Sequence, residues 1–372
     1  MRIALVLAGP YPDLRGSQVL LRHLAGGIRG RGHTVHLVTY GDVGPVPPGP
    51  WTGRILRDVA LVVRLWATVR REAIDLIHAH NYEAAIAGLA VGRLTGRPVV
   101  YHGHTALADE LPLYFGSVLA RRAAARLGRL LDASVPRRAD FCIAVSETLG
   151  DILRRRGVLE HGLACIPPVP PPGDTGRAPR PAASTGLVCY AGNLDGYQNL
   201  GFLLEAFARV RACVPGARLV IATHAAPDRA LATPRDGVEI VRAADYDQVL
   251  ALLTAADVAV CPRVEGSGFP MKIPNYMAAG KAIVASAGSA KGLRDGVTAR
   301  VVPDGDADAF AAAVVDLLRD PGARARLGAS ARRAVEDPQA WEDILDRIEV
   351  IYALVLARQA SPALLPRLSQ SS

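Results

Sequence analysis

The sequence has few cysteines, and none of its apolar stretches is long enough to cross a membrane. The five cysteines form no Cys-x-x-Cys pair, and three lie in the apolar runs "DFCIAVS", "LVCYAG" and "VAVCPR". An odd number of thiols in such runs argues against a disulfide scaffold or a zinc site and favours a cytoplasmic protein. No stretch approaches the roughly 20 apolar residues of a membrane span. The apolar opening, "MRIALVLAGPYPD", is too short for a signal peptide and predicts a first β-strand.

Aromatic residues are also scarce, at 5% against 50% hydrophobic residues in total, so we expect an aliphatic core. A chain of 372 residues exceeds the size of one typical core, which predicts two domains. The net charge of +8 would suit a nucleic acid or a membrane surface, although a GC-rich coding bias toward arginine explains it equally well. Nucleic acid is disfavoured because the arginines do not alternate with aromatic residues and no recognition motif is present.

Short apolar runs alternate with helix-periodic segments through the first half of the chain. Residues 3–8, "IALVLA", are typical of a strand buried in a parallel sheet. A turn, a helical segment and the strand "TVHLVTY" follow, which is the opening of a doubly wound sheet. The alternation continues through "DLIHAH", "PVVYHGH" and "FCIAVS". We therefore predict an α/β, Rossmann-like domain over residues 1–165.

A proline-rich segment separates this half from a second alternating half. Residues 166–184 contain seven prolines in 19 positions and predict a stiff linker. Strands such as "LVCYAG", "RLVIAT" and "DVAVCP" then predict a second Rossmann-like domain over 185–338. A helix over 339–360 and a disordered tail over 361–372 complete the chain. Parallel sheets bind ligands at the carboxyl ends of their strands, so we expect the two domains to face one shared cleft.

The first strand–helix turn offers a candidate anion site. It lacks the Gly-x-Gly-x-x-Gly fingerprint of dinucleotide-binding proteins. Arg15, Gly16 and Ser17 nevertheless precede a helix, whose free amide groups favour an anion. An ordinary turn with a serine cap explains these three residues equally well.

Four histidines follow two neighbouring predicted strands. They are His78 and His80 in "HAHNY" and His102 and His104 in "HGHTALADE". Their i, i+2 spacing, without an acidic residue at ligand spacing, argues against a metal site, and we expect none. One histidine, Asp109 or Glu110 at a cleft edge would suit assistance to an acceptor hydroxyl, and a structural role fits any single histidine as well. The acidic run "PDGDADAF" is interpreted as a helix cap and not as a metal site.

The segment over residues 265–286, "EGSGFPMKIPNYMAAGKAIVAS", combines a glycine-broken loop with a short helix and a buried strand. Gly266 and Gly268 permit close approach of the backbone to a ligand. The predicted helix start, near Phe269 to Lys272, is a candidate anion site, to which Lys272 adds a positive charge. Asn275 lies about one turn further on and can hydrogen-bond a polar group of a ligand.

The chain resembles glycosyltransferase family 4. The resemblance rests on "GPYPDLRGSQVLLRHLAGGIRGRGHTVHLVTYG", "IDLIHAH", "VVYHGHT", "IAVSE", "YAGNLDGYQNLGFLLEAF" and "GFPMKIPNYMAAGKAIVAS", in that order over residues 1 to 355. It implies a GT-B fold of two Rossmann-like domains and metal-independent, retaining transfer of a sugar from a nucleotide diphosphate to a hydroxyl, without a cofactor. His104 falls where related enzymes place a catalytic histidine, and Asp109 is the second candidate catalytic residue. The predicted donor-binding residues are Arg15, Gly16, Gly192, Asn193, Gln198, Ser267, Gly268, Phe269, Pro270, Lys272 and Asn275.

The sequence departs from the family pattern at both charged parts of the donor site. A Gly-Arg-Leu turn followed by Lys-Gly normally clamps the diphosphate, but here "GNLDGYQN" places Asn193 and Gln198 at the two cationic positions. The family's Glu-x7-Glu pair falls on Ser267 and Asn275, and Glu265 lies two residues too early to align.

The missing charges matter because a charge-assisted hydrogen bond is roughly twice as strong as a neutral one. We hypothesise that Lys272, together with Arg263 and Lys281, neutralises the diphosphate instead. Two alternatives stay open: a GT-B-fold epimerase of a sugar nucleotide, and a non-catalytic partner subunit that kept the fold.

An arginine-rich segment at 117–138 suggests where an acceptor-bearing surface would dock. Its sequence, "SVLARRAAARLGRLLDASVPRR", holds six arginines and a partly separate apolar face. Such helices bind anionic lipid, and enzymes of the resembled family often act on lipid-linked acceptors. Peripheral attachment to the inner face of a membrane is therefore one expectation, and an ordinary helix with a solvated face is the other.

Overall fold

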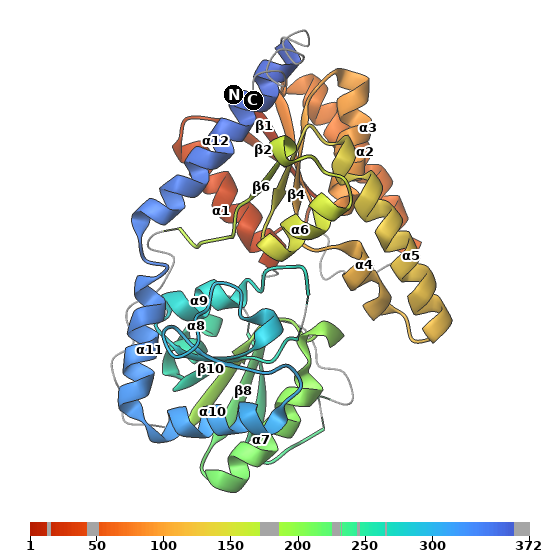
Figure 1. Cartoon of the computed structure of the whole chain (residues 1–372). Helices are drawn as coiled ribbons and strands as arrows, with labels where there is room; N and C mark the ends of the chain where they lie inside the picture. Colours follow the sequence, from red (N-terminus) through yellow and green to blue (C-terminus); the bar gives the residue numbers. More distant parts are fainter. Residues whose placement is uncertain are drawn as a thin grey trace. The chain divides into compact units, whose positions relative to one another are not determined.

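The computed structural model describes residues 1–12, 16–42, 52–171, 186–224, 231, 233–243, 246–264 and 266–360, without the side chains of Thr52, Tyr246 and Pro338. The chain divides into two compact units (Figure 1). The first holds the described residues of 1–167, apart from Gly16, together with 342–360, and the second holds Gly16 and those of 168–341. Residues 172–185 of the predicted linker and the predicted tail at 361–372 lie outside the described residues.

The first unit is built on a six-stranded sheet in which every pairing is parallel, in the order β2-β1-β3-β4-β5-β6. Its strands are mostly apolar because helices cover both faces of the sheet, and the histidines in three of the strands are the main exceptions. The strands are β1 (Arg2–Leu7), β2 (Thr34–Val38), β3 (Leu76–His80), β4 (Val99–Gly103), β5 (Phe141–Ala144) and β6 (Leu163–Cys165). The helices are α1 (Gly16–Gly30), α2 (Thr52–Arg71), α3 (Tyr82–Thr95), α4 (Leu107–Glu110), α5 (Val118–Ser134) and α6 (Glu147–Arg155).

The second unit repeats this plan with the parallel order β12-β11-β10-β7-β8-β9. Two apolar layers, one on each face of the sheet, form its core. The strands are β7 (Leu187–Ala191), β8 (Arg218–Thr223), β9 (Val238–Arg242), β10 (Val258–Cys261), β11 (Ala282–Ser286) and β12 (Arg300–Val302). The helices are α7 (Leu200–Cys213), α8 (Tyr246–Ala255), α9 (Lys272–Ala278), α10 (Ala307–Arg319) and α11 (Pro321–Arg333). The predicted α/β class with two doubly wound sheets is confirmed.

Side-chain caps set where several helices begin. The side chains of Asn81, Ser117 and Ser146 each accept a hydrogen bond from a backbone amide in the first turn of α3, α5 and α6. Asp306 caps α10 in the same way, with its Oδ1 2.8 Å from the amide nitrogen of Ala309. The interpretation of "PDGDADAF" as a helix cap is therefore confirmed for Asp306.

The last helix, α12 (Pro338–Ala360), contributes its residues from Glu342 onward to the first unit. In Figure 1 it lies with α1 on one side of the first sheet, and α2 and α3 lie on the other. Arg31, just after α1, donates to Asp346 at 2.6 Å and to Glu349 at 3.1 Å. Arg347 donates to the carbonyl of Cys165 at 2.7 Å, beside the edge strand β6. These contacts join the end of the chain to both edges of the first unit's fold.

None of the helices in the described ranges combines the length and apolar character that crossing a bilayer requires. All five cysteines are free.

Candidate functional site

The loop that follows β7 forms the centre of the candidate donor site in the second unit. Gly192 and Asn193 come directly after this central strand, at its carboxyl end. The hydroxyl of Tyr190 donates to the Asn193 carbonyl at 2.7 Å, and the Asn193 side-chain amide donates to the Tyr197 hydroxyl at 2.8 Å. The Asn193 side chain therefore organises the loop itself.

Lys272, the first residue of α9, points its ammonium group at this loop. Its Nζ donates to the Oε1 of Gln198 at 2.6 Å and lies 3.9 Å from the centre of the Tyr190 ring. Gln198 is buried and Lys272 is partly exposed. Burial lowers the pKa of Lys272 to about 7; Cys261 and Asp195 oppose this shift, and Arg263 adds to it. At neutral pH the ammonium is therefore poised between its charged and neutral forms.

Gly192 keeps the space beside this ammonium open. A Cβ atom at position 192 would lie 3.0 Å from Lys272 Nζ and 3.1 Å from the Tyr190 hydroxyl. A side chain at this position would therefore crowd both groups, and one of them would have to shift by a few tenths of an ångström. The glycine therefore leaves room for the ammonium against this stretch of backbone.

Arg263, which follows β10, brings a second cation to the same loop. Its guanidinium carbon lies 5.1 Å from the centre of the Tyr197 ring, within the range of a cation–π contact. Arg263 and Lys272 thus both reach the segment Gly196–Gln198, which contains one of the two positions where the resembled pattern has a cation.

Lys281, the third cation proposed from the sequence, was predicted wrongly. It precedes β11 and so lies at the amino end of the strand, whereas the candidate site lies at the carboxyl end of parallel β7. Its buried ammonium donates to the carbonyls of Thr254 and, at 2.8 Å, Ala256. These carbonyls end α8, so Lys281 caps that helix and is not available to a ligand.

Two residues that the sequence did not single out hold α9 and its preceding loop in place. Tyr276 accepts a hydrogen bond from the Ala191 amide at 2.8 Å, which fixes α9 against the end of β7. Lys291 donates to the carbonyls of Gly266 and, at 2.9 Å, Gly268. The scarcity of aromatic residues was the one feature of the sequence that could have drawn attention to Tyr276. Nothing in the sequence distinguished Lys291 from other lysines.

The other predicted donor-site residues lie around this loop or outside the described chain. Ser267 and Pro270 are buried, and Phe269 packs near Gly292. Asn275 is partly exposed on α9. Gly16 is the first residue of α1. Arg15 and Glu265 lie outside the described residues.

Four histidines of the first unit gather at the carboxyl ends of β3 and β4. Parallel register places His80 opposite His102. His80 Nδ1 lies 3.1 Å from His104 Nε2, and His78 Nε2 lies 3.1 Å from His102 Nδ1. His78, His80 and His102 are buried, and His104 is partly exposed. The cluster therefore consists of two hydrogen-bonded pairs.

The same cluster can be compared with a metal centre. Ligand nitrogens of His78, His80 and His102 lie within 4.8 Å of one another. However, the ring of His80 stacks on those of His78 and His102, with interplanar angles of 21° and 25°. Nitrogen lone pairs lie in the ring plane, so stacked rings do not converge on one point as zinc ligands must. The geometry favours hydrogen bonding between the rings.

The second candidate catalytic residue, Asp109, lies on the short helix α4, and buried Asp132 anchors that helix from α5. Asp132 accepts hydrogen bonds from the amides of Leu107 and Ala108 at 2.9 and 3.1 Å, and from the Tyr82 hydroxyl at 2.6 Å. Asp132 therefore positions the segment that carries Asp109. The sequence placed Asp132 in the arginine-rich helix without any sign of burial.

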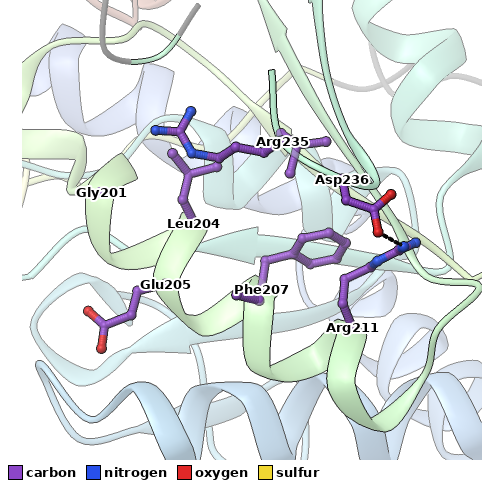
Figure 2. Close-up of a pocket in the computed structure, with 9 residues that line it drawn as sticks. Gly201, Leu204, Glu205, Phe207, Arg211, Arg235 and Asp236 are labelled. Carbon is purple, nitrogen blue, oxygen red and sulfur yellow. Dashed lines mark hydrogen bonds and ion pairs between the residues drawn. The ribbon is translucent and has the colours of Figure 1, made fainter. Parts of the chain in front are cut away.

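A pocket of about 560 Å³ lies elsewhere in the second unit, against α7 and the start of β9 (Figure 2). Its lining includes Phe207 and the ion pair between Arg211 and Asp236. It contains none of the predicted site residues.

Comparisons with known proteins agree with this architecture. A family model for glycosyltransferase family 4 matches residues 14–169, and one for glycosyl transferases group 1 matches residues 185–320. The phosphatidyl-myo-inositol mannosyltransferase of Mycobacterium leprae is 26% identical over 95% of this chain and 97% of its own.

Two solved structures share the fold over nearly the whole chain. Sucrose-phosphate synthase from Thermosynechococcus elongatus has a TM-score of 0.79 at 20% identity, covering 96% of this chain and 99% of its own. HepE of Anabaena, solved in complex with UDP-glucose, has a TM-score of 0.72 at 17% identity, covering 94% of this chain and 100% of its own.

Proposed function

We propose that this chain, which belongs to glycosyltransferase family 4 and has the GT-B fold, transfers a sugar from a nucleotide diphosphate to a hydroxyl acceptor. The transfer retains the configuration of the anomeric carbon and needs neither a metal nor a cofactor. The observation that carries the proposal is the contact between Lys272 and Gln198, which brings a cation to a position where the family's own cation is absent.

The leaving group explains why this cation matters. As the bond from the anomeric carbon to the diphosphate breaks, negative charge develops on the phosphate oxygens. A positioned ammonium beside an open glycine turn stabilises that charge more than it stabilises the bound substrate. Lys272 supplies the ammonium, and Gly192 leaves the backbone beside it uncovered by a side chain. Arg263 contacts the same loop and would contribute to neutralising the charge.

The acceptor hydroxyl then forms the new bond to the anomeric carbon on the face from which the diphosphate departed, and its proton passes to the leaving phosphate. On the first unit, His104 and Asp109 are the proposed catalytic residues for this step. The similarity to HepE, which was solved with UDP-glucose, supports a nucleotide-sugar donor. The similarity to a mannosyltransferase supports transfer of a sugar.

Binding and product analysis together test this function. We expect calorimetry with UDP, GDP and ADP in the presence of EDTA to show one nucleotide binding clearly more tightly than the others. With the matching labelled sugar nucleotide, label should appear in a new glycoside only when an acceptor is added. Conversion of the donor to an epimer without acceptor would identify an epimerase, and no binding by any nucleotide would identify a non-catalytic subunit.

We further propose that the protein is cytoplasmic and docks on an anionic membrane surface through α5. On this helix Val118, Leu119, Leu127 and Leu130 are exposed beside the exposed Arg121, Arg122, Arg126 and Arg129. Apolar side chains that enter the headgroup layer and arginines that meet anionic lipids are the two features of an interfacial helix. The lipid would bring a membrane-borne acceptor to the first unit.

Vesicle sedimentation tests the docking. We expect binding to vesicles of phosphatidylcholine with phosphatidylglycerol and little binding to phosphatidylcholine alone. Replacing Arg121, Arg122, Arg126 and Arg129 by glutamine should weaken binding by up to about 1,000-fold, since each arginine near an anionic surface contributes about 1 kcal/mol. The matched control replaces Arg70, Arg93, Arg155 and Arg326, which are exposed on four other elements. Equal loss in both variants would show that only total charge matters and would contradict docking through α5.

A further inference from the structure

The four clustered histidines form two hydrogen-bonded rows, one of which includes a tyrosine hydroxyl while the other ends at His104. One row runs from the Tyr352 hydroxyl of α12 to His78 Nδ1, at 2.6 Å, and on from His78 Nε2 to His102 Nδ1. The other row joins His80 Nδ1 to His104 Nε2. The ring of His80 lies 4.6 Å from that of His78 and 4.7 Å from that of His102, so the two rows stack. Only His104, at the end of the second row, is partly exposed.

The remaining nitrogen of His80 limits how protons are shared in its row. Within the part of the chain that the structure describes, His80 Nε2 is buried and has no hydrogen-bond partner. A neutral imidazole carries one proton, so either His80 Nδ1 donates to His104 Nε2, or His104 Nε2 donates to His80 Nδ1. The second choice would place the His80 proton on Nε2, as a buried N–H group without an acceptor. The first choice leaves Nε2 as an unpaired acceptor instead. Buried donors without a partner are rarer than buried acceptors without one, so the first choice is favoured.

We propose that His80 is a positioning residue that fixes His104 as the neutral tautomer protonated on Nδ1, so that His104 presents a hydrogen-bond donor to the sugar. This inference rests on the proposed function for its catalytic meaning, although the tautomer is a property of the protein alone. His104 then acts by donating a hydrogen bond from its Nδ1–H group and not by accepting a proton from the acceptor hydroxyl.

The surroundings of His104 keep it neutral. Burial lowers the pKa of His104 to about 4 and, with the charge of His104, that of His78 to about 3. The titratable rings that face it are His80 from β3 and His102 from β4, whose pKa values burial also lowers. Each charged ring would repel the others, so protonation of one opposes protonation of the next. A neutral His104 donor is therefore maintained through the physiological pH range.

Nuclear magnetic resonance tests the tautomer directly. In a long-range ¹H–¹⁵N spectrum of protein labelled at histidine, we expect His104 to show a protonated Nδ1 and an unprotonated Nε2 from pH 5.5 to 8, by the argument that a pKa near 4 lies well below this range. His104 is assigned from the spectrum of His104→Gln. A protonated Nε2, or a doubly protonated ring at neutral pH, would overturn the proposal.

Three substitutions at His80 then separate positioning from mere packing. Asn places an amide N–H near the site of the His80 Nδ1–H group, so His80→Asn should keep the tautomer and stay within about twofold of the wild-type rate of sugar transfer. His80→Leu fills the space without a donor and should lower kcat roughly fivefold to tenfold, the value of one hydrogen bond. His80→Asp should move the proton of neutral His104 to Nε2 and raise its pKa. Only the doubly protonated ring would then keep the Nδ1–H group, so kcat should fall as the pH rises through that pKa. His161→Asn, at an exposed histidine, is the control.

The outcomes distinguish this proposal from the proposed function. If no nucleotide sugar is turned over, the function fails while the spectrum still decides the tautomer. If transfer occurs and the leucine and asparagine variants fall equally, His80 serves only to pack the cluster and the proposal is wrong.

Discussion

Replacement of Lys272 by alanine is expected to lower the rate of sugar transfer by about 100-fold or more, which is typical for the loss of one donor to a developing oxyanion. Lys272 is the cation whose ammonium contacts the Gln198 side chain on the loop after β7. The affinity for the nucleoside diphosphate should fall as well, because the product carries the same charge. Steady-state kinetics and calorimetry measure the two effects, and near-normal values of both would contradict the assignment of Lys272 to the diphosphate.

The matched control for this variant is Lys281→Met. This lysine is buried near the sheet and donates to the carbonyls at the end of α8. We expect the control to lower the midpoint of thermal unfolding while leaving the affinity for the nucleotide unchanged. The comparison separates the loss of a ligand contact from a general weakening of the second unit.

The pH dependence of nucleotide binding tests the role of Lys272 independently. Burial lowers the pKa of Lys272 to about 7, so below pH 7 the ammonium is charged and ready to meet an anion. Above pH 7 a growing fraction is neutral, and binding must first restore the proton. Affinity for the diphosphate should therefore fall as the pH rises from 7 to 9, and this decline should be absent in Lys272→Ala.

Asp132→Ala is expected to destabilise the first unit by about 3 kcal/mol or more. The substitution leaves two backbone amides and a tyrosine hydroxyl without their acceptor, and each unpaired buried donor costs about 1–3 kcal/mol. The three donors are the amides of Leu107 and Ala108 and the hydroxyl of Tyr82. Chemical denaturation measures the loss. Because the same carboxylate holds α4, the variant should also lower activity through a displaced Asp109.

Asp151→Ala serves as the control for this stability measurement. Asp151 is exposed and pairs with Arg154 on the surface of α6 at 2.9 Å. Exposed pairs of this kind contribute about 0–1 kcal/mol, so the control should change the free energy of unfolding very little. Equal effects of the two substitutions would show that Asp132 is not the anchor of α4.

The parallel sheets could be predicted because their strands carry an unmistakable pattern. A strand such as "IALVLA" is buried on both faces, so it is apolar at every position, and this pattern is visible without any tertiary information. The gathering of His78, His80, His102 and His104 followed from the same logic, since neighbouring parallel strands end at one edge. Which ring nitrogens form hydrogen bonds with each other depends on the rotation of the side chains, and no local sequence pattern determines this rotation.

The candidate donor site was only partly predictable for a similar reason. Lys272 and Gln198 are separated by 74 positions, and their contact depends on how α9 packs beside β7. Lys281 was misassigned because a lysine close in sequence to Lys272 lies at the other end of the strand. Asp132 was overlooked because a single acid among arginines is normally solvated, and its burial follows from contacts with α4.

The placement of α12 has a consequence for biosynthesis. Two side chains of the first unit find hydrogen-bond partners in the residues from Glu342 onward. His78 pairs with the Tyr352 hydroxyl, and Arg31 donates to the carboxylate of Asp346. Domains usually fold in order as the chain leaves the ribosome. Here the amino-terminal half emerges first but is completed last, after the entire second unit has been translated. Until α12 has been synthesised, His78 and Arg31 lack these hydrogen-bond partners.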